Sequence, residues 1–489
     1  MKKLICLLLT LLITLIGITA FAKQDTRESI RLPILMYHSV SENQDDFSIT
    51  PEVFESNMRT ITSYGYTPVK FQDVIDYVYD GTKLPERPIL ITFDDGYSNN
   101  FTHAFPILKK LGYPATIFTI GSSVGKSTYK DTGISMNPHF SYTDAREMNL
   151  SKLISIQSHT YDMHQWAQGE TTDTVRENIL SFEDEKTVDY AKIVRDDLLA
   201  FKKVTEGQIG HTVNVLSYPN GRYNAISETV ARSLGFKATV STAIGTNYIQ
   251  KNNPDSLYML NRYNMNSTVT DNVLSSWLRK DAKEMNITNN EYSDDSKYED
   301  GIKVYVNDKI INYNNPPMLK VTTTMVPMRA TLEAMGARVT WDDYTKTATA
   351  IMNNVITKFS IDSAIYYTNG KSGYLPMETL LVEGDTYIPL RAIAESFGCI
   401  VQWDDQTGTV NITAEDKPDK SIYYITQNGK NMYNGTGTNI GDAMWVIEKT
   451  DQNNYKAYNL NDFEITLEIK TENGLNYIEE NQVELIPCM

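Results

Sequence analysis

Two histidines lie close together in the segment SHTYDMH, residues 158–164, of a chain that contains only six histidines. His159 and His164 are five positions apart, whereas two metal ligands on one face of a helix are four apart. Taken alone, a pair at this spacing is more often two ordinary loop histidines. On a loop that leaves a strand, however, both imidazoles can turn toward one point, and the apolar run LISIQ before His159 predicts such a strand.

Two adjacent carboxylates, Asp94 and Asp95, follow the apolar run PILITF in the motif TFDDG. Adjacent carboxylates repel each other, so placing both at a buried strand end costs free energy unless they share a cation or a proton. Taken alone, Asp-Asp-Gly is also a common turn. Two histidines and one carboxylate make a catalytic zinc set that leaves a position for water. The second carboxylate could then accept the proton of that water.

Two further strand ends carry polar residues. The run PILMYH ends in His38, and the run NVLSYPNG leads through Tyr218 and Asn220 to Gly221. Proline and glycine shape a tight loop there, whose backbone N–H groups could point into the same mouth. Because sites in parallel α/β sheets form at the carboxyl ends of the strands, we expect these strand ends to build one site together.

The elements that must position these residues form an alternating series from residue 30 to about residue 280. Short apolar runs predict strands, and the stretches between them predict helices, three of which end at Gly65, Gly81 and Gly112. The alternation of strand and helix predicts an α/β domain with a largely parallel sheet, and about seven such units would suit a barrel.

The four motifs together resemble the polysaccharide deacetylase family, carbohydrate esterase family four, in its poly-N-acetylglucosamine deacetylase-like branch. The likeness is carried by TFDDG, SHTYDMH, SYPNG and LPILMYH, and we assign residues 30–285 to this domain. The resemblance implies a distorted (β/α) barrel in which Asp95, His159 and His164 bind a divalent metal. Zn²⁺ is the expected metal, with Co²⁺ or Ni²⁺ as alternatives.

The same resemblance implies the catalytic groups. Asp94 would be the general base for a water molecule that the metal activates. The metal and the backbone N–H near Asn220 would stabilise the oxyanion formed at the acetamide carbonyl. Tyr218, in the same motif, is the other residue expected at the substrate.

The chain departs from the family pattern at two positions. Ser217 stands where many members have an arginine that orients the base, and no histidine follows His211 to act as the general acid. We therefore hypothesise that Arg262, in the stretch LNRYN, pairs with Asp94, and that His38 gives a proton to the leaving amine. A structural histidine at a strand end is the alternative for His38.

Other imidazole and aromatic side chains are expected outside the site. His103 and His139 are predicted at the surface. Trp166 could stack on a sugar ring, but a packed loop tryptophan is the favoured interpretation because tryptophan is commonly largely buried.

An internal repeat follows the first domain. The stretch VPMRATLEAMGARVTWDD returns 62 positions later as IPLRAIAESFGCIVQWDD, and each copy reads as a short helix, a glycine and a strand. Residues 303–414 resemble the stalk-like domain named for the N-terminal part of copper amine oxidases, here without a His or Cys cluster for copper. We expect a small α+β module in which Arg329 and Arg391 tie the two halves together. Residues 421–489 are predicted to be a β-rich segment of unknown role.

The N-terminus indicates where the protein is located, and the net charge limits its possible partners. A basic start, an apolar run and an Ala-Phe-Ala ending predict a signal peptide over residues 1–22, with an uncleaved membrane anchor as the alternative. Residues 281–302 lack apolar periodicity, and we place a linker at 286–302. The formal net charge of −16 argues against a nucleic-acid partner. Cys399 and Cys488 are expected as two buried thiols rather than as a disulfide.

The sequence therefore predicts an exported or cell-surface N-deacetylase that acts on a polymer bearing N-acetylglucosamine, either peptidoglycan or poly-N-acetylglucosamine. The C-terminal module would bind cell-wall polymer. An O-acetyl polysaccharide esterase is the alternative within enzymes, because the same chemistry serves esters. A catalytically inactive carbohydrate-binding surface protein is the alternative outside enzymes, because the expected histidine acid is missing.

Overall fold

The computed structural model describes residues 29–42, 46–130, 133–165, 175–279, 301–320, 323–352, 354–382 and 384–414, and shorter segments between residues 422 and 487. The predicted signal peptide, Trp166, Cys488 and most of the predicted linker lie outside the described residues. Among the helices that are described, none combines the length and the apolar composition needed to cross a bilayer.

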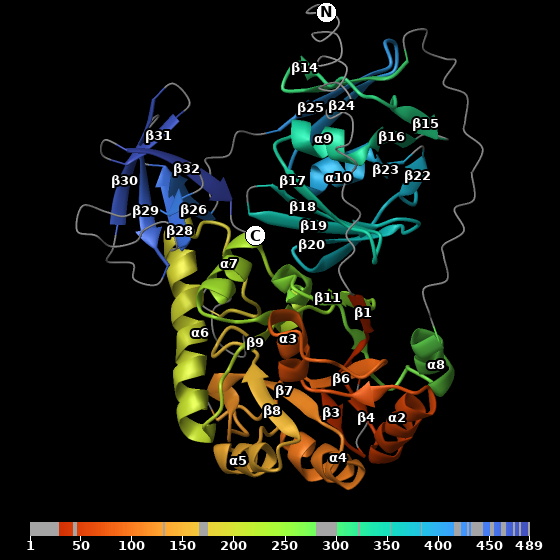
Figure 1. The fold of residues 1–489 in the computed structure, drawn as a ribbon, viewed down its shortest axis with the longest axis vertical. Coiled ribbons are helices and arrows are strands. Elements are labelled where there is room, and N and C mark those ends of the chain that lie inside the picture. The colour runs from red at the N-terminus through yellow and green to blue at the C-terminus, as the bar shows by residue number, and fades with distance from the viewer. Residues whose placement is uncertain are drawn as a thin grey trace, which may run out of the picture.

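A parallel sheet forms the centre of the first region, as predicted (Figure 1). Its strands follow the order β10-β9-β8-β7-β6-β2-β12, and β5 also pairs with β6. All positions of β6 are buried, which matches an apolar strand covered on both faces. The strands are β2 (Ile34–Tyr37), β5 (Thr67–Pro68), β6 (Pro88–Phe93), β7 (Ala115–Thr119), β8 (Ile154–Ser158), β9 (Val215–Ser217), β10 (Ala238–Val240) and β12 (Tyr263–Asn264).

One short segment links the two outer strands of this sheet into a distorted barrel. Leu260 forms a parallel bridge with Val240 of β10, and β12 then pairs with β2. Arg262 lies between these two contacts, fully buried. Small antiparallel and parallel pairs complete the region: β1 (Ser29–Leu32) with β11 (Asn247–Gln250), and β3 (Ser39–Val40) with β4 (Ser48–Ile49).

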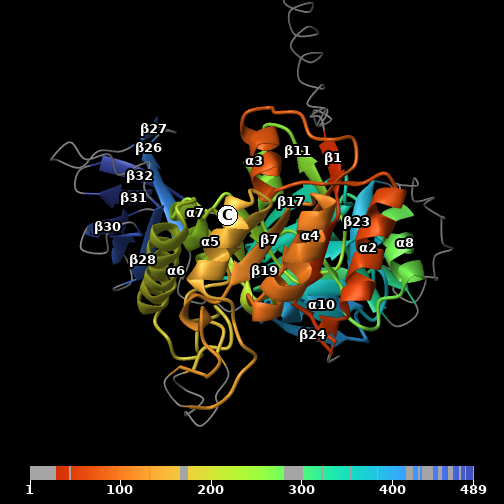
Figure 2. The same ribbon diagram turned by 90° about the horizontal axis from the view of Figure 1, so that it is seen from below.

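Helices cover the outside of the barrel, and Figure 2 shows them in a row from α6 through α5, α4 and α2 to α8. In α2 the buried residues Phe54, Met58 and Ile61 recur at helical spacing, and Thr50 caps the first turn through the backbone N–H of Val53. The helices are α2 (Pro51–Ser63), α3 (Phe71–Tyr79), α4 (Phe105–Leu111), α5 (Tyr142–Leu150), α6 (Thr187–Ile209), α7 (Ala225–Ser233) and α8 (Asp271–Arg279), with the short turns η2 (Gly121–Ser123), η3 (Pro219–Gly221) and η4 (Pro254–Leu257).

The helix predicted to end at Gly112 is irregular at its start. Residues Asn100–Ala104 form a π-helical turn, η1, before α4 begins. Pro106 has no backbone N–H and cannot continue a regular ladder, so the wider turn accommodates it.

The repeat module has the predicted helix–glycine–strand pattern in both copies. Helix α9 leads through Gly336 into β17, and α10 leads through Gly398 into β24. The halves are joined by β13 with β25 and by β16 with β23. The elements are β13 (Lys303–Val306), β14 (Lys309–Ile310), β15 (Met318–Lys320), β16 (Thr323–Pro327), α9 (Met328–Ala334), β17 (Arg338–Asp342), β18 (Thr347–Met352), β19 (Val355–Ser360), β20 (Ile365–Thr368), β21 (Lys371–Tyr374), β22 (Leu380–Val382), β23 (Asp385–Pro389), α10 (Leu390–Ser396), β24 (Ile400–Asp404) and β25 (Thr409–Thr413).

The two repeat arginines act within their own halves, which corrects the prediction that they tie the halves together. Arg329 Nη1 donates to Val339 O at 3.0 Å, and Arg391 Nη1 donates to Val401 O at 2.7 Å. Each arginine therefore joins the helix of one copy to the strand of the same copy. Cys399 is buried in this module, as expected.

The C-terminal segment is an antiparallel sheet that closes on itself, since β26 pairs with both β28 and β32. It packs against α6 through β28 (Figure 1). Its strands are β26 (Ile422–Gln427), β27 (Lys430–Asn431), β28 (Met444–Lys449), β29 (Asn454–Asn459), β30 (Thr466–Glu472), β31 (Leu475–Ile478) and β32 (Asn481–Pro487).

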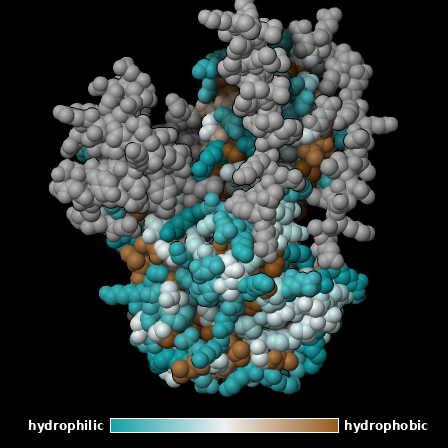
Figure 3. All heavy atoms as spheres, in the orientation of Figure 1, coloured by the Kyte–Doolittle hydropathy of each residue, from teal (hydrophilic) through white to brown (hydrophobic). Residues whose placement is uncertain are grey.

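The repeat module packs directly on the barrel. Ile356 of β19 belongs to the same apolar cluster as Phe201 of α6 and Val230 of α7. At the rim, Asn354 Oδ1 accepts the backbone N–H of Ile226 at 3.0 Å. On the face of the barrel seen in Figure 3, most of the surface is hydrophilic, with scattered hydrophobic residues.

Candidate active site

The two adjacent carboxylates lie at the carboxyl end of β6, where the sequence places them. Asp94 and Asp95 are 2% and 4% exposed, and the backbone N–H of Asp94 donates to Tyr37 O of β2 at 2.9 Å. Asp95 has φ of 70°, a left-handed conformation that is uncommon outside glycine and often found at functional sites. A side chain at Gly96 would meet Thr119 Cγ2 at 2.7 Å, so only glycine fits the turn.

Both histidines of SHTYDMH turn toward Asp95. His159 follows β8, and His164 ends the loop; their ring centroids are 5.0 Å apart and the planes are nearly perpendicular, at 87°. His159 Nδ1 lies 2.8 Å from Ser217 O, and His164 Nδ1 lies 3.0 Å from Glu177 O. A carbonyl oxygen can only accept, so each Nδ1 carries a proton, and in the neutral imidazole Nε2 then presents a lone pair.

Three lone-pair atoms therefore face one another. Asp95 Oδ1 lies 3.5 Å from His159 Nε2 and 3.5 Å from His164 Nε2. Among the described residues, this buried Oδ1 has no hydrogen-bond partner. Burial lowers the pKa of His159 to about 4, so its imidazole is neutral near pH 7. Uncompensated acceptors of this kind fit a divalent cation, and these three residues offer ligand atoms within 4.8 Å of one another.

A carboxylate on α6 holds the loop between the two histidines. Asp197 accepts the backbone N–H groups of Tyr161 and Asp162, both at 2.7 Å, and burial raises its pKa to about 7. Thr160, in the same loop, has a left-handed φ of 67°. Asp197 could not be predicted from the sequence, because it lies 33 positions after His164 in a helix whose pattern carries no motif.

The second carboxylate, Asp94, forms a bidentate ion pair with Arg262. Arg262 Nη1 donates to Asp94 Oδ1 and Nη2 to Oδ2, both at 2.7 Å. Ser217 Oγ, 3.0 Å from Nη2, also donates to Asp94 Oδ2 at 3.2 Å. Burial alone would raise the pKa of Asp94, but the Arg262 guanidinium holds that pKa well below its usual range. The contact has the partners that the sequence hypothesis named; its catalytic role stays a prediction.

The remaining predicted residues lie in different surroundings. His38 is half-buried after β2, near Phe47, and it lies close enough to both carboxylates to favour their ionised forms. Asn220 is exposed, has φ of 55°, and donates through Nδ2 to Glu177 O at 3.1 Å. Because Glu177 O also accepts from His164, one carbonyl joins the loop of Asn220 to the second histidine.

Tyr218 does not face the site, in contrast to the prediction. Its side chain is fully buried, its ring stacks on Tyr223 at 5.2 Å, and its hydroxyl donates to Glu228 Oε2 at 2.8 Å. The side chain therefore has no surface for a substrate, because the strand end turns it into the core beneath α7.

His139 is buried rather than at the surface, which corrects another prediction. The side chain is 9% exposed, and its ring centroid lies 5.1 Å from that of Tyr97. Tyr97 belongs to the loop that follows the two carboxylates. Burial lowers its pKa, while the charge of Asp95 acts in the opposite direction, so His139 lies within the electrostatic reach of the site. Composition marked this stretch as polar, and only the folded loop shows that Tyr97 covers it.

Family models match two parts of the chain. The polysaccharide deacetylase model matches residues 81–239, which contain the three clustered candidate ligand residues. The chain carries a polysaccharide deacetylase domain. The model of the copper amine oxidase N-terminal domain matches residues 305–412, within the repeat module. The resemblance found in the motifs is thus confirmed for both domains.

The deacetylase domain is similar to several curated proteins. The Bacillus subtilis protein YxkH, a polysaccharide deacetylase by name, is 28% identical over 52% of this chain and 78% of its own. The poly-β-1,6-N-acetyl-D-glucosamine N-deacetylase of Escherichia coli K12 is 25% identical over 41% of this chain. That of Staphylococcus aureus MRSA252 is 25% identical over 42%. The alignments cover 32% and 64% of these last two proteins.

Among solved structures, that of IcaB from Ammonifex degensii aligns with 51% of this chain and 97% of its own. The identity is 23% and the TM-score is 0.43.

Proposed function

We propose that this chain is an exported, metal-dependent polysaccharide N-deacetylase that hydrolyses the acetamido groups of an N-acetylglucosamine polymer, either peptidoglycan or poly-N-acetylglucosamine. The observation that carries the proposal is the meeting of three ligand atoms beside the buried ion pair of Asp94 and Arg262. The names of the Escherichia coli and Staphylococcus aureus relatives support the choice of polymer. The apolar N-terminus supports export.

The proposed metal ligands are Asp95, His159 and His164. Two imidazoles and one carboxylate favour Zn²⁺, with Co²⁺ or Ni²⁺ as alternatives. A cation held there would polarise the acetamide carbonyl and lower the pKa of a water molecule at the site.

Asp94 is the proposed general base. Its pKa is held low, so it is ionised at neutral pH and can accept a proton from the attacking water. Arg262 and Ser217 fix both carboxylate oxygens, which keeps the base in one orientation as the proton moves.

The oxyanion donor is proposed to be the backbone near Asn220. Its left-handed conformation and the hydrogen bond of its side chain to Glu177 O hold the loop in a fixed shape before substrate arrives. Preorganised N–H groups stabilise a developing oxyanion without reorganisation during the reaction.

The leaving amine also needs a proton. We propose His38 as its donor, because it follows β2 and lies near both carboxylates. His139 is the second candidate, because it is buried within reach of the same charges. Separate His38→Asn and His139→Asn variants distinguish them, since the donor's loss should lower acetate release by about 100-fold or more.

The test of the proposal is to measure acetate and new primary amine together, using acetylated glucosamine oligomers and Zn²⁺. We expect the two products in equal amounts, and neither from Asp94→Asn. Acetate without amine, from an O-acetylated polymer, would indicate the esterase instead. The absence of acetate from oligomers and from purified cell wall, with metal bound, would indicate a binding protein and overturn the proposal.

A further inference from the structure

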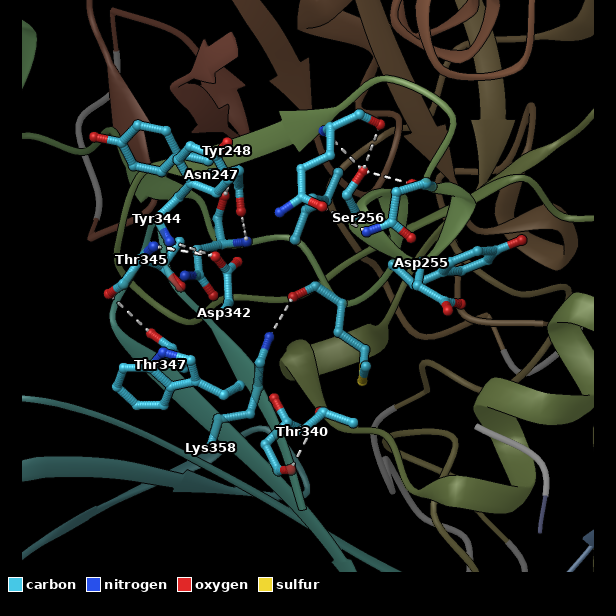
Figure 4. A pocket seen from close by; sticks show the side chains of 18 of the residues that line it. Asn247, Tyr248, Asp255, Ser256, Thr340, Asp342, Tyr344, Thr345, Thr347 and Lys358 are labelled. Atoms are coloured by element: carbon cyan, nitrogen blue, oxygen red, sulfur yellow. Dashed lines mark hydrogen bonds between the residues drawn. The ribbon is translucent and has the colours of Figure 1, made fainter. Parts of the chain in front are cut away.

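A cavity of about 380 Å³ lies between the barrel and the repeat module (Figure 4). Its volume is within the range typical of small-ligand sites. One wall comes from β11 and the chain up to Asn261, and the other from β17, β18 and the turn between them. The cavity therefore exists only where the two domains meet.

Aromatic rings line the cavity from both sides. Tyr248 of the barrel and Tyr344 of the module stack with centroids 6.1 Å apart and planes at 19°. Trp341 lines the module side, and its Nε1 donates to Asp343 Oδ1 at 2.8 Å, which fixes the indole. Tyr258 adds a further ring on the barrel side. Flat amphipathic rings of this kind suit a ligand with apolar faces and polar edges.

The polar groups of the cavity leave no excess of positive charge. Arg232 is paired with Asp255 at 2.7 Å and with Glu228 at 2.9 Å. Lys358 points from β19 toward the barrel and donates to Met259 O at 3.0 Å (Figure 4). Asp342 is a further carboxylate on the module side. The three lining carboxylates, of Asp255, Asp342 and Asp343, outnumber the two lining cations, Arg232 and Lys358. The lining therefore disfavours an anionic ligand and favours an uncharged one.

The internal repeat shows that the cavity is specific to one copy. Asp342 Oδ1 accepts the backbone N–H of Tyr344 at 2.8 Å, and Asp404 Oδ1 does the same for Gln406 at 2.9 Å. The first aspartate thus has the same turn role in both copies. Only the first tryptophan, Trp341, lines the cavity, whereas Trp403 does not.

The cavity shares a chain segment with the active site. Met259, Leu260 and Asn261 line it, and the next residue is Arg262, which pairs with Asp94. Met259 has a left-handed φ of 55°. The cavity is therefore bordered by the residue that precedes, in the chain, the arginine paired with the proposed base.

We propose that this interdomain cavity binds one uncharged pyranose unit of the polysaccharide, apart from the acetamide that reacts. The identity of the sugar rests on the proposed function; the cavity does not. The repeat module is then a substrate-binding part of the enzyme, and it holds another unit of the same polymer chain.

The test uses the full chain with Asp94→Asn, so that no substrate is consumed, and the hexamer of N-acetylglucosamine as the probe in calorimetry. Adding Trp341→Ala should weaken binding about 10-fold, which is the loss of one aromatic contact. Adding Trp403→Ala, the matched position of the second copy, should leave the affinity unchanged. Equal affinities of the two variants would overturn the proposal.

Two further measurements keep the result interpretable. Tyr248→Ala removes a ring from the barrel side and should also weaken hexamer binding. Thermal unfolding of each variant checks that it is folded. If folded Trp341→Ala and Tyr248→Ala both bind like the parent, the cavity is not a subsite. Acetate release by the chain with native Asp94 is measured separately: its absence, with hexamer binding that depends on Trp341, would contradict the proposed function and leave the cavity proposal standing.

Discussion

At the scale of single residues, the buried pair of Asp94 and Arg262 sets the chemistry that the site can do. Both groups are almost fully removed from water, and each carboxylate oxygen accepts one guanidinium N–H at 2.7 Å. A carboxylate in this setting stays ionised because its partner compensates the cost of burial. The pair also holds the proposed base in one orientation, which a flexible lysine would not do.

Replacing Arg262 by methionine should therefore remove the ion pair that holds the proposed base, Asp94. The unpaired, buried Asp94 would gain a higher pKa, so the acidic limb of the pH–rate profile should move to higher pH. We expect acetate release to fall about 100-fold or more at pH 7. We also expect the free energy of unfolding to fall by about 3–5 kcal/mol, as when one partner of a buried pair is removed.

Arg262→Lys is the control, because it keeps the charge and loses the bidentate geometry. It should retain stability and metal binding better than Arg262→Met while still losing activity. Full activity in either variant, at all pH values, would contradict the assigned role of the arginine.

The carboxylate of Asp197 holds the loop from His159 to His164 through two hydrogen bonds to its backbone, and it does not bond to the proposed metal ligands. Asp197→Ala leaves two partly buried backbone N–H groups without their acceptor, so the loop from His159 to His164 should lose its fixed shape. We expect Zn²⁺ affinity to fall about 10- to 100-fold, the usual effect of losing a supporting group around a metal site. Calorimetric titration measures it.

Asp196→Ala is the matched control for this change. Asp196 is the preceding residue of the same helix, and its side chain is 54% exposed. It should bind Zn²⁺ like the wild type. A shared loss in both variants would point to the helix rather than to the two hydrogen bonds.

At the scale of elements, the turn between β20 and β21 of the repeat module contacts the loop that carries Asn220. Asn369 O accepts the backbone N–H of Tyr223 at 3.3 Å, and a Cβ at Gly370 would lie 1.8 Å from Gly221 O. Gly221 belongs to η3, the loop that carries Asn220. The module therefore bounds the loop that is proposed to stabilise the oxyanion.

Gly370→Ala should displace that loop, since backbone rather than a flexible side chain opposes the new methyl group. We expect kcat/KM for acetate release to fall at least about 10-fold, because small misplacements at a catalytic site are costly. Gly384→Ala in the same module is the control: its φ of 88° is equally unfavourable for alanine, but nothing lies within 4 Å of the new Cβ. Equal activity of the two variants would show that the turn does not position the loop.

Strands and helix ends could be predicted from the sequence where a single local signal determines them. The strands before Asp94 and His159 are short apolar runs, and Gly65, Gly81 and Gly112 stop the expected helices. Local signals do not predict whether a residue at the end of a strand lies in the core or at the surface. Tyr218 and Asn220 are two positions apart, yet one is in the core and the other is exposed.

Residues brought together from distant segments were predictable only with the family resemblance. The pairing of Arg262 with Asp94 was inferred from the missing arginine at Ser217, not from any pattern near Arg262. Asp197 and His139 had no such clue, because their roles arise from the packing of α6 and of the loop after Gly96. The same holds for Arg329, whose partner inside its own half depends on the geometry of helix and strand.

At the scale of the whole molecule, a lysine links the module to the barrel. Lys358 donates to Met259 O across the interface, and burial lowers its pKa to about 8. Between pH 8 and the ordinary lysine pKa of 10.5, the unfolded chain binds more protons than the folded chain. The contribution of this group to stability should therefore increase as the pH rises through that window.

Chemical denaturation of wild type and Lys358→Met at pH 7.5, 9 and 10 measures this effect. The stability of wild type relative to the variant should rise with pH. The exposed Lys371→Met is the control and should show no such trend. A difference between wild type and Lys358→Met that is constant with pH would show that the lysine is not desolvated at the interface.

The central claim is that Asp95, His159 and His164 hold one metal that hydrolysis of the acetamide requires. The most direct measurement is acetate release from acetylated glucosamine oligomers as Zn²⁺ is added back to chelator-treated full chain. We predict that release rises from zero to a plateau at one Zn²⁺ per chain. His164→Ala should show no plateau, and Asp94→Asn should bind Zn²⁺ without releasing acetate. Release by the metal-free chain at the plateau rate, or a normal plateau in His164→Ala, would contradict the account.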